Sequence, residues 1–102
     1  MKDLKEKYVL VKNVYNNGCA MPETNVLQVF EDEKSAEKRL KELAYGALST
    51  MTNRARTGVD VDVTWFSMFE FIAELTVDKY YLNLDDKDTI RTTWKIHKTF
   101  EA

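Results

Sequence analysis

The side chains of this sequence that could take part in chemistry are one thiol, one imidazole and several closely spaced carboxylates. Cys19 is the only cysteine and His97 is the only histidine. Nucleophilic catalysis requires a nucleophile, a base that activates it and a group that orients the base. The two residues lie far apart in the sequence, and no flanking residue indicates activation. We therefore expect no catalytic site, and interpret Cys19 as a loop residue and His97 as a surface residue of an edge strand.

Two groups of aspartates could bind a metal ion. Asp60 and Asp62 share a face of a predicted strand, and Asp85, Asp86 and Asp88 cluster in a predicted turn. A calcium loop has a fixed spacing that ends in a bidentate glutamate, and no such glutamate follows this turn. The three glycines are isolated and fit neither nucleotide-binding pattern. We expect neither a metal nor a cofactor, and interpret the aspartates as solvated.

The element around which the rest of the chain must be arranged is a helix, predicted for residues 32–53. Asp32 can accept hydrogen bonds from the first free backbone N–H groups of this helix, and Gly58 suits the region after its end. Seven apolar residues recur every three or four positions and form one stripe. They are Ala36, Leu40, Leu43, Ala44, Ala47, Leu48 and Met51. A helix cannot bury such a stripe alone, so we expect it to cover one face of a sheet.

Strands are predicted on both sides of this helix. Residues 8–15 and 25–31 precede it, and the apolar residues on both sides of the first of these strands favour an inner position in the sheet. After the helix, residues 59–66 alternate with period two, which places Val63 and Trp65 on the inward face and Phe66 on the outward face.

Residues 67–77 fit two interpretations. The alternation of apolar residues, in which Phe69 shares a face with Leu75, indicates a strand, whereas Ser67 and Glu70 have the spacing of a helix capping box. The aromatic and β-branched residues favour the strand. We then expect turns at residues 78–79 and 85–88, a strand over 80–84 and a last strand over 89–98.

Connections this short permit only antiparallel pairing. The prediction is therefore an α+β fold of ββαβββ order, with an antiparallel sheet of about five to six strands and one long amphipathic helix on one face. The length of 102 residues, with 44% hydrophobic residues, suits a single domain over residues 1–102. The N-terminal apolar run is too short for a membrane span or signal peptide, and a single cysteine excludes an internal disulfide. Both features favour the cytoplasm.

A net charge of −2 gives no overall attraction to phosphate or anionic lipid. We therefore expect a non-enzymatic module that binds a protein partner, as a monomer or homodimer. Aromatic residues predicted on the surface are common anchors of interfaces, and acidic residues would complement a basic, nucleic-acid-handling partner. The predicted contacts are Tyr45, Phe66, Tyr81, Asp60, Asp62, Asp85, Asp86 and Asp88.

The alternative is a nucleic-acid-binding protein that uses the last strand. Basic and aromatic groups on a sheet can follow a phosphate backbone and stack on bases. The residues for this role are Arg91, Trp94, Lys95 and Lys98. Acidic residues on neighbouring strands could instead pair with these cations, which favours the protein-binding interpretation.

Three stretches, YVLVKNVY, VFEDEKSAEKRLKEL and YYLNLDDKDTIRTTWKI, resemble small uncharacterised proteins of bacteriophages and other mobile elements of Gram-positive bacteria. Many short, acidic, non-enzymatic proteins from that source bind and disable a host complex, anti-CRISPR proteins among them. The resemblance implies an α+β fold and an inhibitor that occupies a surface of its target. It assigns no functional residue to this sequence.

Overall fold

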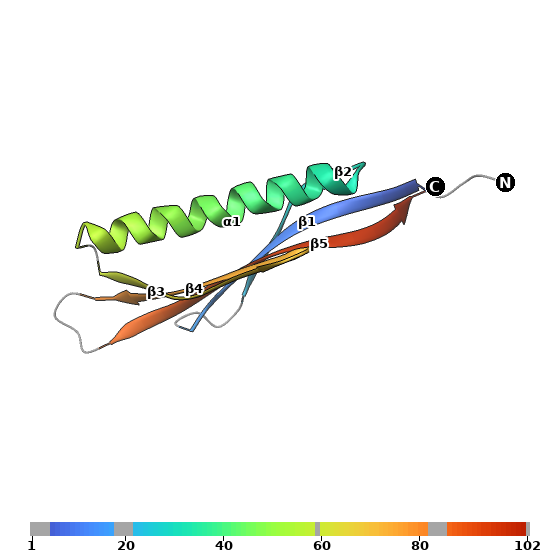
Figure 1. Ribbon diagram of the computed structural model, residues 1–102. Coiled ribbons are helices and arrows are strands. Elements are labelled where there is room, and N and C mark those ends of the chain that lie inside the picture. The colour runs from blue at the N-terminus through green and yellow to red at the C-terminus, as the bar shows by residue number, and fades with distance from the viewer. Residues whose placement is uncertain (1–4, 18–21, 59, 82–85, 102) are drawn as a thin grey trace.

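The computed structural model describes residues 5–17, 22–58, 60–81 and 86–101. They form one five-stranded antiparallel sheet with a single helix on one of its faces, in the order β2-β1-β5-β4-β3 across the sheet (Figure 1). The elements in chain order are β1 (Lys5–Asn16), β2 (Glu23–Phe30), α1 (Glu33–Arg56), β3 (Val61–Phe69), β4 (Ile72–Tyr80) and β5 (Lys87–Glu101). The predicted α+β class and the ββαβββ order are confirmed.

The two longest strands lie inside the sheet. β1 pairs with β5 from Lys5 opposite Glu101 to Asn16 opposite Ile90, and the molecule is accordingly elongated, with extents of 65 × 28 × 17 Å. The inner position expected for the first strand is therefore confirmed. The prediction that His97 belongs to an edge strand is wrong, because β5 is the central strand.

The helix begins where its sequence indicates. Asp32 is the N-cap, and its side chain accepts hydrogen bonds from both the backbone N–H and the hydroxyl of Ser35, at 2.8 Å each. These bonds lower the pKa of the Asp32 carboxyl. At the other end, Thr57 is the C-cap, and Gly58 follows with a φ of 80°, in the left-handed region that glycine adopts without strain.

The Asp32→Ala variant is expected to melt about 4–8 °C lower than the wild type, because the first turn of α1 loses the acceptor for a free N–H group. Thermal unfolding followed by circular dichroism measures the shift. Asp32→Ser is the matched control, since serine can also cap a helix and should restore most of the loss. Equal melting of the alanine variant and the wild type would show that this cap contributes nothing.

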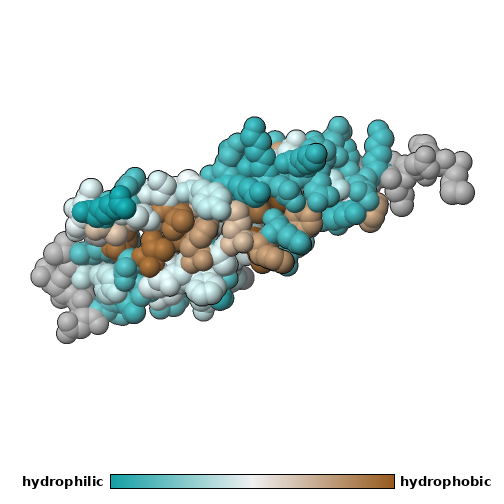
Figure 2. Space-filling model, viewed as in Figure 1, coloured by the Kyte–Doolittle hydropathy of each residue, from teal (hydrophilic) through white to brown (hydrophobic). Residues whose placement is uncertain are grey.

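The core lies between α1 and the sheet face that it covers. Ala36, Leu40 and Ala44 of the helix stripe are buried there, and the other four members are half-buried. They pack on side chains of the three central strands, namely Tyr8, Leu10, Ala73, Leu75, Val77, Trp94 and Ile96. Figure 2 shows that some hydrophobic surface remains visible between α1 and the sheet, toward the end of the helix.

A β-bulge corrects the predicted orientation of two aromatic residues. The register of β3 on β4 shifts between Val63 and Trp65, so Thr64 is an extra residue. The shift turns Trp65 to the uncovered face, where it is 56% exposed, and packs Phe66 against the core. The sequence placed both residues on the opposite faces because its period of two assumes an unbroken ladder.

A hairpin turn corrects the interpretation of residues 67–77. These residues are extended, as favoured, but Glu70 and Phe71 form a two-residue turn between β3 and β4. Phe69 therefore pairs with Ile72 on the uncovered face and does not share a face with Leu75.

β4 continues through Tyr80, so the turn predicted at residues 78–79 is wrong. Of the strand predicted over 80–84, Tyr80 ends β4 and Tyr81 lies outside the strands; residues 82–84 are outside the described part.

Candidate functional site

The sheet face opposite α1 carries a row of side chains that are apolar except for one lysine. Cross-strand pairing joins Phe69 to Ile72, Ile72 to Lys95, Lys95 to Val11, and Val11 to Val26. These five residues, one from each strand, form what we call the apolar row. At the usual spacing of strands it is about 19 Å wide. Phe69 is 70% exposed and Val26 is 64% exposed, so the row is in contact with solvent.

The rest of this face, which we call the open face, alternates in character along the strands. On one side of the apolar row, Val9 pairs with Val29 and extends the apolar surface. On the other side lies a polar row, followed by Trp65 of β3 and Tyr15 of β1. The polar row consists of Ser67, Glu74, Thr93, Asn13 and Thr24. α1 is the only helix of the described residues, so no second helical layer covers this face.

The cations of β5 on the open face have different surroundings. Arg91 pairs with Glu74, its Nε lying 3.5 Å from Oε1, and its guanidinium lies 5.9 Å from the centre of the Tyr15 ring. Lys95 is exposed between Ile72 and Val11 and takes part in no ion pair among the described residues. Lys95 is therefore a positive charge without an ion-pair partner among the described residues, on a largely apolar surface where Glu70 lines the same hollow.

The sequence did not identify most of this surface. Val11, Val26, Phe69 and Ile72 were assigned to strands, but no single strand indicates which residues meet across five strands. One signal for this surface was available in the sequence. The predicted second strand, residues 25–31, carries apolar residues on both of its faces, although a polar loop separates it from the first strand. A strand of this kind at a sheet edge leaves one apolar face uncovered, as β2 does.

The predicted acidic contacts come together at one end of the sheet, apart from Asp85, which lies outside the described residues. The Tyr80 N–H donates to the Asp60 carbonyl at 2.8 Å, and Asp62 lies opposite Asp78 of β4. At the same end, the Tyr81 hydroxyl donates to the Asp88 carboxylate and the Tyr81 N–H to the Asp86 carbonyl. We call this region the acidic end.

Tyr45 and Phe66, also predicted as contacts, lie apart from both surfaces. Tyr45 is 52% exposed on α1, and its ring centre is 5.6 Å from that of Phe66. Phe66 is half-buried and packs against the core. This pair therefore connects α1 to β3, and only Tyr45 offers much surface to a partner.

The predicted nucleic-acid residues are divided between the two faces of β5. Arg91 and Lys95 lie on the open face, whereas Trp94 is 3% exposed in the core and cannot stack on a base. Lys98 is on the side of α1 and pairs with Glu6 at 3.0 Å. That pair raises the pKa of Lys98 and lowers the pKa of Glu6. The four residues do not form one binding surface.

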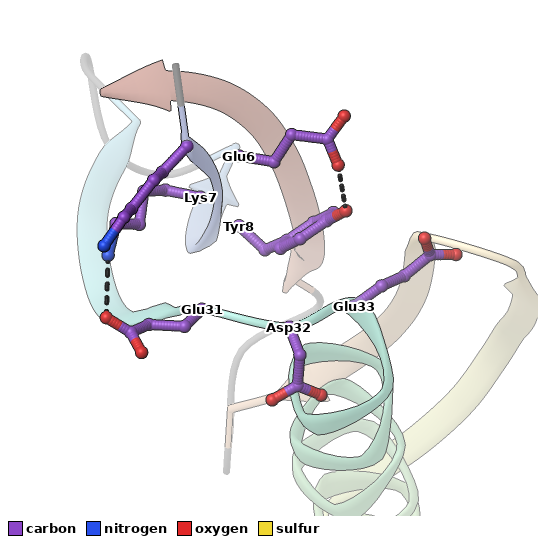
Figure 3. Close-up of a pocket in the computed structure, with 7 residues that line it drawn as sticks. Glu6, Lys7, Tyr8, Glu31, Asp32 and Glu33 are labelled. Atoms are coloured by element: carbon purple, nitrogen blue, oxygen red, sulfur yellow. Dashed lines mark hydrogen bonds and ion pairs between the residues drawn. The ribbon is translucent and has the colours of Figure 1, made fainter. Parts of the chain in front are cut away.

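A hollow of about 510 Å³ lies where β1 meets the start of α1 (Figure 3). Glu6, Glu31, Asp32 and Glu33 line it, and the first three already accept hydrogen bonds. Lys7 pairs with Glu31 at 2.9 Å, which lowers the pKa of that carboxyl. The Tyr8 hydroxyl donates to Glu6, which raises the pKa of Tyr8. These contacts join β1 to the start of α1 and occupy the carboxylates of Glu6, Glu31 and Asp32.

No described part of the chain holds three or more histidine, cysteine, aspartate or glutamate side chains in an arrangement that could bind a metal ion. The described helix is not apolar enough to cross a membrane. Cys19 lies outside the described residues, and His97 is exposed opposite Val9 on the open face. Comparison with protein-family models, with curated proteins and with solved structures found no match.

Proposed function

We propose that this chain is a non-enzymatic protein-binding module and that it binds its partner through the open face. The apolar row carries this proposal. Apolar patches that stay exposed on a soluble domain commonly mark interaction sites, and the row crosses all five strands without a covering layer. The strands hold its side chains in place, so little conformational entropy would be lost on binding.

The free charge of Lys95 defines the chemistry of the partner. A protein surface that buries the apolar row must also cover Lys95, and an unpaired buried charge is costly. The partner would therefore offer an apolar patch with an aspartate or glutamate near its centre. Such a pair would fix the orientation of the complex.

A second copy of this chain would fit the open face less well than a different protein. Stacking the apolar row on itself about a two-fold axis would place Lys95 opposite the same residue of the other copy. Like charges brought together in an apolar interface oppose association. We therefore favour a different protein as the partner.

The acidic end indicates which kind of protein the partner would be. A protein with an apolar patch and a basic rim would fit both the apolar row and Asp60, Asp62 and Asp86. Proteins that handle nucleic acid present basic surfaces of this kind. An inhibitor that occupies such a protein agrees with the resemblance to phage proteins, and we propose it as the biological role.

The Phe69→Ser and Ile72→Ser double variant is expected to weaken partner binding at least about tenfold, because a few large exposed apolar anchors contribute most of the affinity of an interface. The partner is first recovered from lysate with the wild-type chain, and its Kd is then measured with each purified variant by calorimetry. Both residues are exposed, so circular dichroism should show an unchanged fold.

Two matched variants test where the interface lies. Tyr45→Ser with Phe100→Ser removes two similarly exposed aromatic rings, 52% and 56% exposed, from outside the open face, and should leave the Kd unchanged. Asp60→Asn with Asp62→Asn and Asp86→Asn tests the acidic end. If the open-face variant binds like the wild type, or if the Tyr45 and Phe100 variant loses as much affinity, the open face is not the interface.

A further inference from the structure

A second apolar surface lies on the opposite side of the sheet, in a groove between the second half of α1 and the strands. The groove has a volume of about 240 Å³. Leu75, Val77 and Trp94 form its buried floor, and Met51 of α1 and Ile90 of β5 are among its half-buried walls. It exists because the helix crosses a twisted sheet and does not cover its whole inner face (Figure 1).

The polar side chains of the groove are strongly biased in charge. Lys12, Arg54 and Lys79 line it, and none of its described lining residues is a carboxylate. Lys12 is half-buried opposite Trp94 and forms no ion pair with a described residue. The ammonium of Lys79 lies 5.8 Å from the centre of the Tyr81 ring.

One carboxylate on this face, Asp88, offsets part of that charge. Asp88 lies opposite Lys79 in the pairing of β4 with β5. It accepts a hydrogen bond from Tyr81 and is not paired with a lysine among the described residues. The groove therefore combines an apolar floor with an excess of positive charge at its sides.

We propose that this groove binds a small amphipathic anion, a carboxylate carried on an apolar chain or ring. The apolar part would cover Val77, Ile90 and Trp94, and the carboxylate would lie against a cation at the side of the groove. The volume is just below the range of about 300–1,000 Å³ common for ligand pockets, which suits a small molecule. This site is independent of the open face, because the sheet separates the two.

Decanoate, below the concentration at which it forms micelles, is the probe for this site. The chain has two tryptophans, and Trp65→Phe removes the exposed one, so that the fluorescence of Trp94 reports on the groove alone. In this background decanoate should produce a saturable change in the emission of Trp94. Decanol should bind more weakly, and decyltrimethylammonium should bind at least about tenfold more weakly than decanoate because the cations repel it.

Charge variants separate binding in the groove from general attraction of the anion to surface lysines. Lys12→Gln with Arg54→Gln and Lys79→Gln, in the Trp65→Phe background, should weaken decanoate binding at least about tenfold. The matched control is Lys34→Gln with Lys38→Gln and Lys41→Gln, which removes the same charge from exposed positions of α1 outside the groove lining. This control should keep the affinity of the parent.

Three results would overturn the proposal. They are the absence of a saturable change with decanoate, equal binding of decanoate and decyltrimethylammonium, and equal loss of affinity in the two triple variants. The first two use the chain with its groove residues intact, so they do not depend on how the triple variants fold.

Discussion

The Leu40→Ala variant is expected to lose about 2–5 kcal/mol of its free energy of unfolding, the range for deleting a fully buried leucine side chain. Leu40 is 0% exposed and lies in the middle of the buried stripe of α1. α1 is the only described element that covers the inner face of the sheet. The cavity would therefore open at the single interface that holds the two layers together.

Urea unfolding followed by circular dichroism measures this loss. A domain of this size commonly has about 5–15 kcal/mol of stability, so the variant should unfold at a clearly lower urea concentration. Lys41→Ala changes the next residue, which is exposed, and should stay within about 0.5 kcal/mol of the wild type. A loss below about 1 kcal/mol for Leu40→Ala would mean that α1 is not firmly packed on the sheet.

This packing was predictable from the sequence because a helix stripe is a local pattern. The spacing of Ala36, Leu40 and Ala44 depends only on the 3.6-residue period, and all three are buried. The N-cap at Asp32 is local in the same sense, since its hydrogen bonds reach only to Ser35. In β5 the buried Trp94 and Ile96 alternate with the exposed Lys95 and His97, which is again a local pattern.

The sequence was misleading where the regular period of a strand is interrupted. Thr64 is an extra residue in β3, and it reverses the faces of Trp65 and Phe66. The turn at Glu70 and Phe71 contains neither glycine nor proline, and Glu70 adopts a positive φ of 49°. The surrounding alternation therefore gave no sign that the chain reverses there.

The open face depends on both of these interruptions, which is why the sequence did not reveal it. Without the bulge, Trp65 and Phe69 would both face the core, and the turn places Ile72 opposite Phe69. The apolar row also needs the register of four strand pairs, and register is a property of the folded sheet. The acidic end needed less, because Asp60 precedes β3 directly and Asp86 and Asp88 flank the connection from β4 to β5.

The second large effect is expected at Asp78, the buried carboxylate of the sheet, which is 6% exposed. Its two oxygens accept hydrogen bonds from the Lys87 ammonium and the Thr89 hydroxyl, each at 2.8 Å. Asp78→Ala should lower the free energy of unfolding by about 1–3 kcal/mol, because it leaves partly buried donors without their acceptor. Asp60→Asn, at an exposed residue of the same end of the sheet, should change stability much less.

The pH dependence distinguishes this carboxylate from a merely well-packed side chain. Lys87 and Thr89 lower the pKa of Asp78 below its usual value, so in the folded state the carboxylate is favoured over the acid. Its contribution to stability is therefore complete above the unfolded pKa of about 3.9 and is lost as the pH falls through the lower folded pKa. The difference in stability between the wild type and Asp78→Asn should be constant near neutral pH and shrink below about pH 4.

Lys87, the partner of Asp78, sets the limit of this stability contribution at high pH. Asp78 raises the pKa of Lys87, so the contribution of Lys87 is complete below its unfolded pKa of about 10.4 and is lost as the pH rises through the folded pKa. Urea titrations at a series of pH values should thus show a plateau in the difference between wild type and variant, with a decline at both ends. A difference that did not change with pH would show that Asp78 stabilises β4 and β5 by its shape and hydrogen bonds alone, and that its charge has no part in holding the acidic end together.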